Sequence, residues 1–164
     1  MCSVKLPNMP SWVYGLGGLT ALGIILNILK EEPGTLVAGF TNGVPMPILV
    51  IPVGNDQWMR RDAGQAFRDL QAAAKQAGLA LVATSGFRSM MDQTKLYTGY
   101  KLGLPGFNLA AAPGYSNHQG GISVDIGGIG SFSSTAYRWM KANARTFGFV
   151  NDVASEYWHW TYKA

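Results

Sequence analysis

The chain contains two histidines, His118 and His159, and each lies in a short segment that also holds an acidic residue. In SNHQGGISVD, paired glycines after His118 allow a tight turn that brings Asp125 back toward the imidazole. In EYWHW, Glu156 stands three residues before His159. Because Cys2 is the only cysteine, a metal site in this chain must use imidazole and carboxylate. Two histidines and one aspartate leave a fourth position open for water, as in catalytic zinc sites.

Glu156 and Arg88 supply the charges that hydrolysis of an amide would need. Residues three apart on a strand face opposite sides, so Glu156 must lie in the turn before the strand to share a cavity with His159. There it could act as a general base on a zinc-activated water. Arg88, in the turn TSGFRS, could stabilise an oxyanion or bind a substrate carboxylate. The alternatives are a surface salt bridge for Arg88 and structural roles for the histidines.

Three motifs, SGFRS, PGYSNHQGGISVD and EYWHW, follow one another along the chain, with a glutamine five residues past the arginine. They resemble the VanY-like D-alanyl-D-alanine carboxypeptidases of the LAS zinc metallopeptidases, over about residues 44–162. The resemblance implies a Zn²⁺ cofactor and a peptidoglycan stem peptide as substrate. Carried over residue by residue, it implies zinc ligands at His118, Asp125 and His159, catalytic roles for Glu156 and Arg88, and substrate contacts from Gln93, Ser116 and Trp158.

Two features depart from that family's pattern. Ser123 stands where the family usually has alanine, a change of one hydroxyl that should leave the ligands in place. Only 30 residues separate Asp125 from Glu156, which leaves little chain for a lid. An open groove of this kind suits a peptide attached to a glycan better than a free dipeptide.

The apolar periodicity predicts an α+β domain with a small antiparallel sheet flanked by helices, and the resemblance implies the LAS/hedgehog-like peptidase fold. Gly78 and Gly148 are typical residues just past a helix end, and Ser133 or Ser134 is suited to begin the last helix. No hairpin-length connections are expected. Helices are predicted over 56–77, 90–102 and 135–147, and strands over 48–53, 79–84, 121–126 and 158–162.

The first third of the chain has a different composition. The stretch Trp12 to Leu29 has no charged residue and is just long enough to span a bilayer, so residues 1–32 are predicted to form an apolar helix that anchors the chain to a membrane. A helix or hairpin buried in the domain is the alternative. Residues 33–55, rich in Pro and Gly, are predicted to be a linker with a first strand, and the zinc peptidase domain is assigned to 40–164. Lys5 before the apolar stretch favours a domain on the wall-facing side.

The net charge of +4 is spread without a basic run, which argues against a nucleic-acid partner. Neither HExxH nor a GxSxG nucleophile elbow occurs in the chain. The predicted function is therefore hydrolysis of stem peptides, most simply as a D-Ala carboxypeptidase. An endopeptidase of a phage endolysin or virion-associated lysin, and a noncatalytic wall-binding module, are the alternatives. The presence of Glu156 favours catalysis over the binding module.

Overall fold

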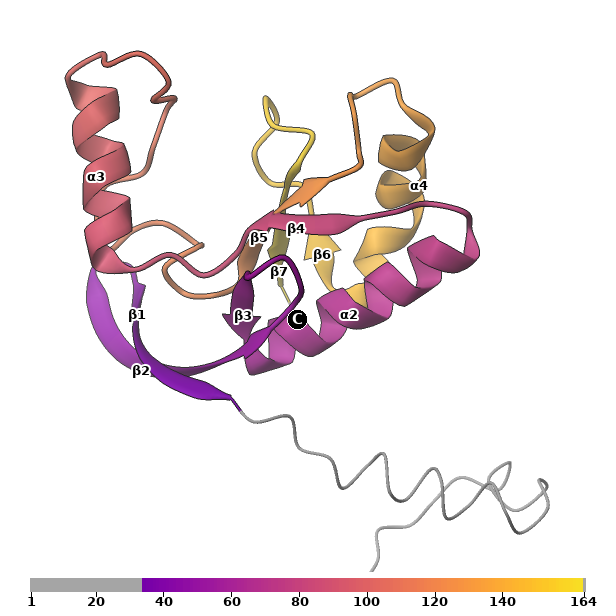
Figure 1. The fold of residues 1–164 in the computed structure, drawn as a ribbon, viewed down its shortest axis with the longest axis horizontal. Coiled ribbons are helices and arrows are strands. Elements are labelled where there is room, and N and C mark those ends of the chain that lie inside the picture. The colour runs from indigo at the N-terminus through magenta and orange to yellow at the C-terminus, as the bar shows by residue number, and fades with distance from the viewer. Residues whose placement is uncertain (1–33, 164) are drawn as a thin grey trace, which may run out of the picture. The chain divides into compact units, whose positions relative to one another are not determined.

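The computed structural model describes residues 34–163, which contain two antiparallel sheets and three α-helices (Figure 1). The predicted α+β class with small antiparallel sheets is confirmed. One sheet has the strand order β1-β2-β3 and the other β4-β5-β7-β6. In chain order the elements are β1 (Thr35–Thr41), β2 (Val44–Pro52), β3 (Trp58–Arg60), α2 (Arg61–Gln76), β4 (Val82–Ser85), α3 (Met90–Lys101), β5 (Ser123–Gly127), α4 (Thr135–Asn143), the 3-10 helix η2 (Ala144–Phe147), β6 (Phe149–Val150) and β7 (His159–Tyr162).

Strands β1 and β2 form a hairpin in the segment that was expected to be a linker. Asn42 and Gly43, with φ of 51° and 81°, close it as a two-residue turn. Pro45 and Pro47 fit within β2 because β3 pairs only with residues 50–52 of this strand. The edge of β2 that faces β3 is therefore unpaired at the two prolines. The expectations of a linker and of no hairpins are therefore corrected for residues 35–52. The extended segment expected over 48–53 is confirmed.

The register of β5 against β7 determines which side chains share a face. Asp125 pairs with His159, and two residues away Ser123 pairs with Thr161, so both pairs lie on the same side of the sheet. The pair between them, Val124 with Trp160, faces the other side and is buried in the hydrophobic core. One face of these two strands is thus polar and the other is apolar.

Helix α2 covers the apolar face, with Phe67 and Leu70 fully buried. The ring of Phe67 packs edge-on against Phe149 of β6, with centroids 6.0 Å apart. The helix was expected from residue 56 but begins at Arg61, because Asp56 has a positive φ of 54° and β3 follows it. The apolar spacing predicted the buried face of α2, and the turn before it was not anticipated.

The last predicted helix divides into two parts. Ser134 caps α4 by accepting a hydrogen bond from the Tyr137 backbone N–H, and Gly148, with φ 80°, ends the following 3-10 turn. Both capping predictions are confirmed. The α-helix itself stops at Asn143, four residues before the predicted end at Phe147.

Helix α3 lies apart from α2 and α4 and packs mainly against the loop that follows it (Figure 1). A side chain at Gly99 would collide with the ring of Phe107, so the loop approaches the helix closely at this point. The Gln93 amide also donates to the backbone of Ala111 in the same loop, at 2.7 Å. The loop is therefore attached to α3 over 102–111, and further along it bonds to the β1–β2 turn, where the Gly43 backbone N–H donates to the Gly114 carbonyl at 2.9 Å.

No helix within residues 34–163 has the length and apolar character needed to cross a membrane. The predicted anchor, residues 1–32 with the apolar stretch 12–29, lies outside the described residues.

Candidate active site

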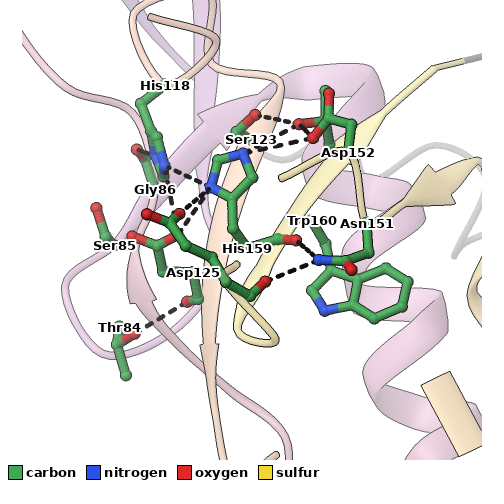
Figure 2. A network of polar contacts seen from close by, with 12 residues as sticks. Thr84, Ser85, Gly86, His118, Ser123, Asp125, Asn151, Asp152, His159 and Trp160 are labelled. Atoms are coloured by element: carbon green, nitrogen blue, oxygen red, sulfur yellow. Dashed lines mark hydrogen bonds and ion pairs between the residues drawn. The ribbon is translucent and has the colours of Figure 1, made fainter. Parts of the chain in front are cut away.

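Three ligand-type atoms converge at one end of a pocket: Nε2 of His118, Nδ1 of His159 and Oδ1 of Asp125 (Figure 2). The His159 nitrogen lies 3.0 Å from the Asp125 oxygen and 3.3 Å from the His118 nitrogen. The remaining side of the triangle, His118 to Asp125, measures 3.5 Å. Atoms that bind one tetrahedral zinc ion at about 2.0–2.1 Å lie about 3.3 Å apart. The three predicted ligands are thus close together, in a triangle of the size that such an ion requires.

The backbone fixes the His118 ring. Its Nδ1 lies 2.8 Å from the carbonyl oxygen of Gly86, which can only accept, so Nδ1 carries the proton and Nε2 presents a lone pair toward Asp125. Gly86 is in turn required, because a Cβ at this position would collide with the backbone oxygen of Trp58. Gly121, with φ 68°, makes the turn that the sequence predicted after His118. The glycines of both motifs therefore position the imidazole.

Asp125 and His159 reach the site from paired strands, as neighbours across β5 and β7. Burial alone would raise the pKa of the Asp125 carboxyl, but the imidazoles of His118 and His159 beside it hold it well below its usual range. Asp125 is therefore a carboxylate at neutral pH even though only 19% of its side chain is exposed. A buried carboxylate beside two imidazoles is a suitable donor set for a divalent cation.

Glu156 lies in the turn before β7, where the predicted geometry required it. Its Oε2 is 3.9 Å from Nδ1 of His159, and 26% of its side chain remains exposed. The Asn151 amide holds this turn, because it donates to the backbone oxygens of both Glu156 and His159 at 2.8 Å. Glu156 is thus beside the ligand triangle and open to the pocket.

Arg88 faces the same pocket from the turn after β4, and Gln93 holds it from behind. The guanidinium donates to the Gln93 carbonyl at 2.9 Å and to the Ser85 hydroxyl at 3.1 Å. Burial lowers the pKa of Arg88, an effect that the nearby carboxylate of Asp125 opposes. Gln93 is fully buried and its amide also bonds to Ala111. Gln93, for which a direct substrate contact was expected, thus lies behind Arg88 and does not line the pocket.

Ser116 and Trp158 both line the pocket, which encloses about 540 Å³. Ser116 is 8% exposed and Trp158 is half-buried beside the ring of Tyr157, with centroids 4.7 Å apart. The pocket thus brings together seven of the eight predicted site residues. It is lined by Arg88, Leu96, Gly106, Asn108, Leu109, Ala110, Ala111, Tyr115, Ser116, Asn117, His118, Asp125, Val153, Glu156, Trp158 and His159.

The family model for VanY, D-alanyl-D-alanine carboxypeptidase, matches residues 56–164, which is most of the chain and includes every predicted site residue. The chain belongs to this family. A curated relative, the D-alanyl-D-alanine carboxypeptidase of Enterococcus faecalis, is 32% identical over 119 residues, covering 58% of this chain and 44% of the relative. The chain spans less than half of the length of these curated relatives.

Solved structures agree with this assignment of fold. A vancomycin-resistance D,D-pentapeptidase VanY variant, crystallised with Zn(II), matches with a TM-score of 0.59 and 25% identity, covering 76% of this chain and 86% of the other. The LdcB LD-carboxypeptidase matches with a TM-score of 0.56 and 25% identity, covering 81% and 70%. The expected resemblance to VanY-like enzymes and their fold is confirmed.

Two polar residues of this VanY-family chain, one buried and one partly buried, support the site and were not predicted. Gln119 is fully buried, and its side-chain oxygen accepts from the Gly114 backbone N–H at 2.6 Å, which fixes the segment that carries His118. Asn151 holds the Glu156 turn as described above. The position of Gln119 directly after His118 could have indicated a supporting role for Gln119. Nothing in the sequence around Asn151 indicated that this residue holds the Glu156 turn.

Proposed function

We propose that this chain is a zinc-dependent peptidase that removes the terminal D-alanine from peptidoglycan stem peptides. The observation that supports it most directly is the triangle of His118, Asp125 and His159, with Glu156 and Arg88 in the same pocket. VanY relatives carry the activity in their names, and one solved VanY structure holds D-Ala-D-Ala. The proposal takes that activity as this chain's own.

His118, Asp125 and His159 would hold the zinc ion through the three atoms of the triangle. A zinc ion bound there polarises a carbonyl and lowers the pKa of a bound water toward ~7. The residues fit because each offers a donor atom that zinc accepts, and because the His118 tautomer leaves Nε2 free. An anionic Asp125 also lowers the electrostatic cost of holding a cation in a partly buried site.

Glu156 would handle the protons of hydrolysis. It takes a proton from the attacking water as the new C–O bond forms, and it passes that proton to the leaving amine as the C–N bond breaks. Its position beside the triangle, with part of the carboxylate exposed to the pocket, allows it to contact both the water and the amine. The products are a shortened stem peptide and free D-alanine.

Arg88 would bind the C-terminal carboxylate of the substrate. Gln93 and Ser85 hold the guanidinium from two sides while leaving it on the pocket wall. A guanidinium offers parallel donors that match a carboxylate, and lysine cannot reproduce this geometry. Ser116 and Trp158 would contact the peptide beside it. A carboxylate bound at Arg88 places the last peptide bond toward the triangle.

Kinetics on two matched pentapeptides test the proposal, one ending in free D-alanine and one in its amide. We expect rapid loss of a single alanine from the free acid, detected by mass spectrometry. The amide should react roughly 30- to 1000-fold more slowly, because Arg88 loses its charged partner, worth about 2–4 kcal/mol. Equal rates on both peptides would instead indicate an endopeptidase, and no cleavage of either would favour the noncatalytic wall-binding module.

We also propose that residues 12–29 attach the chain to the cell membrane with the peptidase domain on the wall side. Their uncharged, apolar composition supports this. Fractionation of cells that express the whole chain or residues 33–164 tests it. The whole chain should sediment with membranes and the shortened chain should not. Equal solubility of the two would contradict the anchor.

A further inference from the structure

His159 has a second set of polar partners on the side of the ring that faces away from the metal triangle (Figure 2). Its Nε2 lies 3.3 Å from the hydroxyl of Thr161 and 3.6 Å from Oδ1 of Asp152. Thr161 is fully buried, and only 21% of the Asp152 side chain is exposed. None of the motifs that suggested the site includes Asp152 or Thr161.

The hydrogens of this cluster can be assigned by counting. The Thr161 hydroxyl has one hydrogen, and it is donated to Oδ1 of Asp152 at 2.8 Å, because a carboxylate only accepts. The Ser123 hydroxyl, 2.7 Å away, must then donate to Thr161. The third contact of the Thr161 oxygen, with Nε2 of His159, can be a hydrogen bond only if Nε2 carries a proton. The 3.0 Å contact of Nδ1 with the Asp125 carboxylate likewise needs a proton on Nδ1, until a cation takes its place.

We infer that Thr161 and Asp152 are positioning residues that accept and hold the Nε2–H of His159 when its Nδ1 lone pair binds a cation between Asp125 and His118. The inference rests on the proposed zinc site, because Nδ1 needs a free lone pair only to bind a cation. Lys163 supports the arrangement by pairing with the other Asp152 oxygen at 3.0 Å, which keeps Oδ1 turned toward Thr161 and His159.

The two imidazoles thus reach the same result by different means. His118 donates from Nδ1 to the carbonyl of Gly86 and offers Nε2, whereas His159 donates from Nε2 to side chains and offers Nδ1. Partners of this kind fix the tautomer and orientation of a ligating ring, and their loss typically costs 10- to 100-fold in metal affinity. The partner of His118 is a backbone carbonyl, which a substitution does not remove. The partners of His159 are side chains, so only they can be removed by mutation.

The first experiment locates the ring protons in the zinc-loaded protein. With two histidines and no histidine tag, ring ¹⁵N spectra report each ring separately. We expect a proton on Nδ1 of His118 and a proton on Nε2 of His159 that exchanges slowly with water, because Thr161 and Asp152 bind it. Zinc bound through Nε2 of His159, or rapid exchange of its Nε2 proton, would overturn the inference.

The second experiment compares zinc affinities, measured by competition with a chelator, in three single variants. Thr161→Val removes the acceptor for His159 and should weaken zinc binding by about 10- to 100-fold. Thr161→Ser keeps the hydroxyl and should restore it. Ser123→Ala also deletes a buried hydroxyl of the same layer, but leaves the Thr161 oxygen facing His159, so its affinity should fall by less than ~10-fold.

The outcomes separate this inference from the proposed function. Equal zinc affinity in wild type and Thr161→Val, with both folded, would overturn the inference and leave the zinc site intact. Absence of zinc binding by the wild type would refute the proposed function and, with it, the inference that rests on it. If Thr161→Val does not fold, Asp152→Ala, which changes a partly exposed side chain, should lower the zinc affinity and speed the exchange of the Nε2 proton.

Discussion

The pocket has two walls that are built in different ways. The ligand wall consists of Asp125, Glu156 and His159, on or just before paired strands whose other face forms the hydrophobic core, together with His118, whose ring is held by the Gly86 carbonyl. The clamp wall consists of Arg88 and Ser116, held by α3 and the loop that packs against it. Backbone pairing therefore positions the first wall, and buried side-chain amides position the second.

Backbone contacts connect the walls on the side of β4, which pairs with β5, and the N–H of Arg88 donates to the carbonyl of His118 at 3.1 Å. Otherwise the ligand wall depends on strand register, and the clamp wall depends on Gln93 and Gln119, both fully buried and hydrogen-bonded. Substitutions in one wall should therefore leave the function of the other largely intact. Metal binding and substrate binding are the two measurements that separate them.

The largest expected effect belongs to the ligand wall. His159→Ala should lower zinc affinity by more than about 100-fold, since loss of a ligand costs more than loss of its outer partner, and activity should be lost with the metal. Metal analysis after dialysis checks this. Gln93→Ala, in the clamp wall, is the control and should retain zinc. Loss of zinc from both variants would show that the walls are not independent.

Glu156→Gln should separate chemistry from metal binding within the ligand wall. The amide keeps the size of the side chain but cannot take a proton, so turnover should fall by about 10²–10⁴-fold while one zinc per chain remains. Turnover on the free-acid pentapeptide and zinc content are measured on the same sample. Unchanged turnover would assign the general base to another group.

Arg88→Lys tests the clamp wall. Lysine keeps the charge but loses the parallel donors, so kcat/KM on the free-acid peptide should fall about 10- to 100-fold, as expected for the loss of a hydrogen bond between charged groups. Zinc content should not change. The amidated peptide serves as the control substrate and should respond much less. A similar fall on both peptides would mean that Arg88 acts on the scissile carbonyl instead.

Gln93→Leu should have a smaller effect on catalysis and a measurable effect on folding. It leaves the Ala111 carbonyl and part of the Arg88 guanidinium without their partner, which should lower the free energy of unfolding by about 1–3 kcal/mol. Urea denaturation measures this. Lys95→Ala, on the exposed side of α3, is the matched control and should stay near the wild-type value. Equal stability of Gln93→Leu and wild type would show that the clamp wall does not need this amide.

The smallest effect is expected at an ion pair outside both walls. The hydrogen bond from Arg60 lowers the pKa of Asp62, so the carboxylate stabilises the fold above its unfolded pKa of about 3.9, and this is lost as pH falls through the lower folded pKa. Asp62→Asn should therefore cost less than about 1 kcal/mol at pH 7 and a smaller amount at pH 2.5. Thermal unfolding at both pH values checks this, with Asp69→Asn on the same helix as control.

The ligand wall was far more predictable from sequence than the clamp wall. His118, Asp125 and His159 lie in short motifs whose glycines and spacing indicate convergence, and the position of Glu156 followed from strand geometry alone. Gln93 was expected to touch substrate, because the motif places it close to Arg88. The motif does not determine whether the glutamine side chain faces the pocket or lies behind the guanidinium. The partners of Gln93 come from a loop 18 residues away, at Ala111.

The hairpin of β1 and β2 shows why part of the fold was missed. Its turn, Asn42-Gly43, is the strongest short hairpin signal that a sequence offers, but the prolines and glycines around it suggested a linker. Those prolines fit because β3 is short and leaves one edge of β2 free, and this depends on tertiary pairing. The proline and glycine content of the segment therefore predicted a linker wrongly, whereas the Asn42-Gly43 pair alone would have predicted the hairpin correctly.

The register of β5 against β7 also limits how this sequence can change length. Asp125 and Ser123 face the polar side, and Val124 between them faces the core. Deleting one residue within β5 would exchange the two faces, burying a carboxylate in the core and turning an aliphatic side chain toward the imidazoles. Insertions and deletions should be excluded from this strand and tolerated in the exposed part of the loop over 102–111, even among homologues whose side chains differ at most positions.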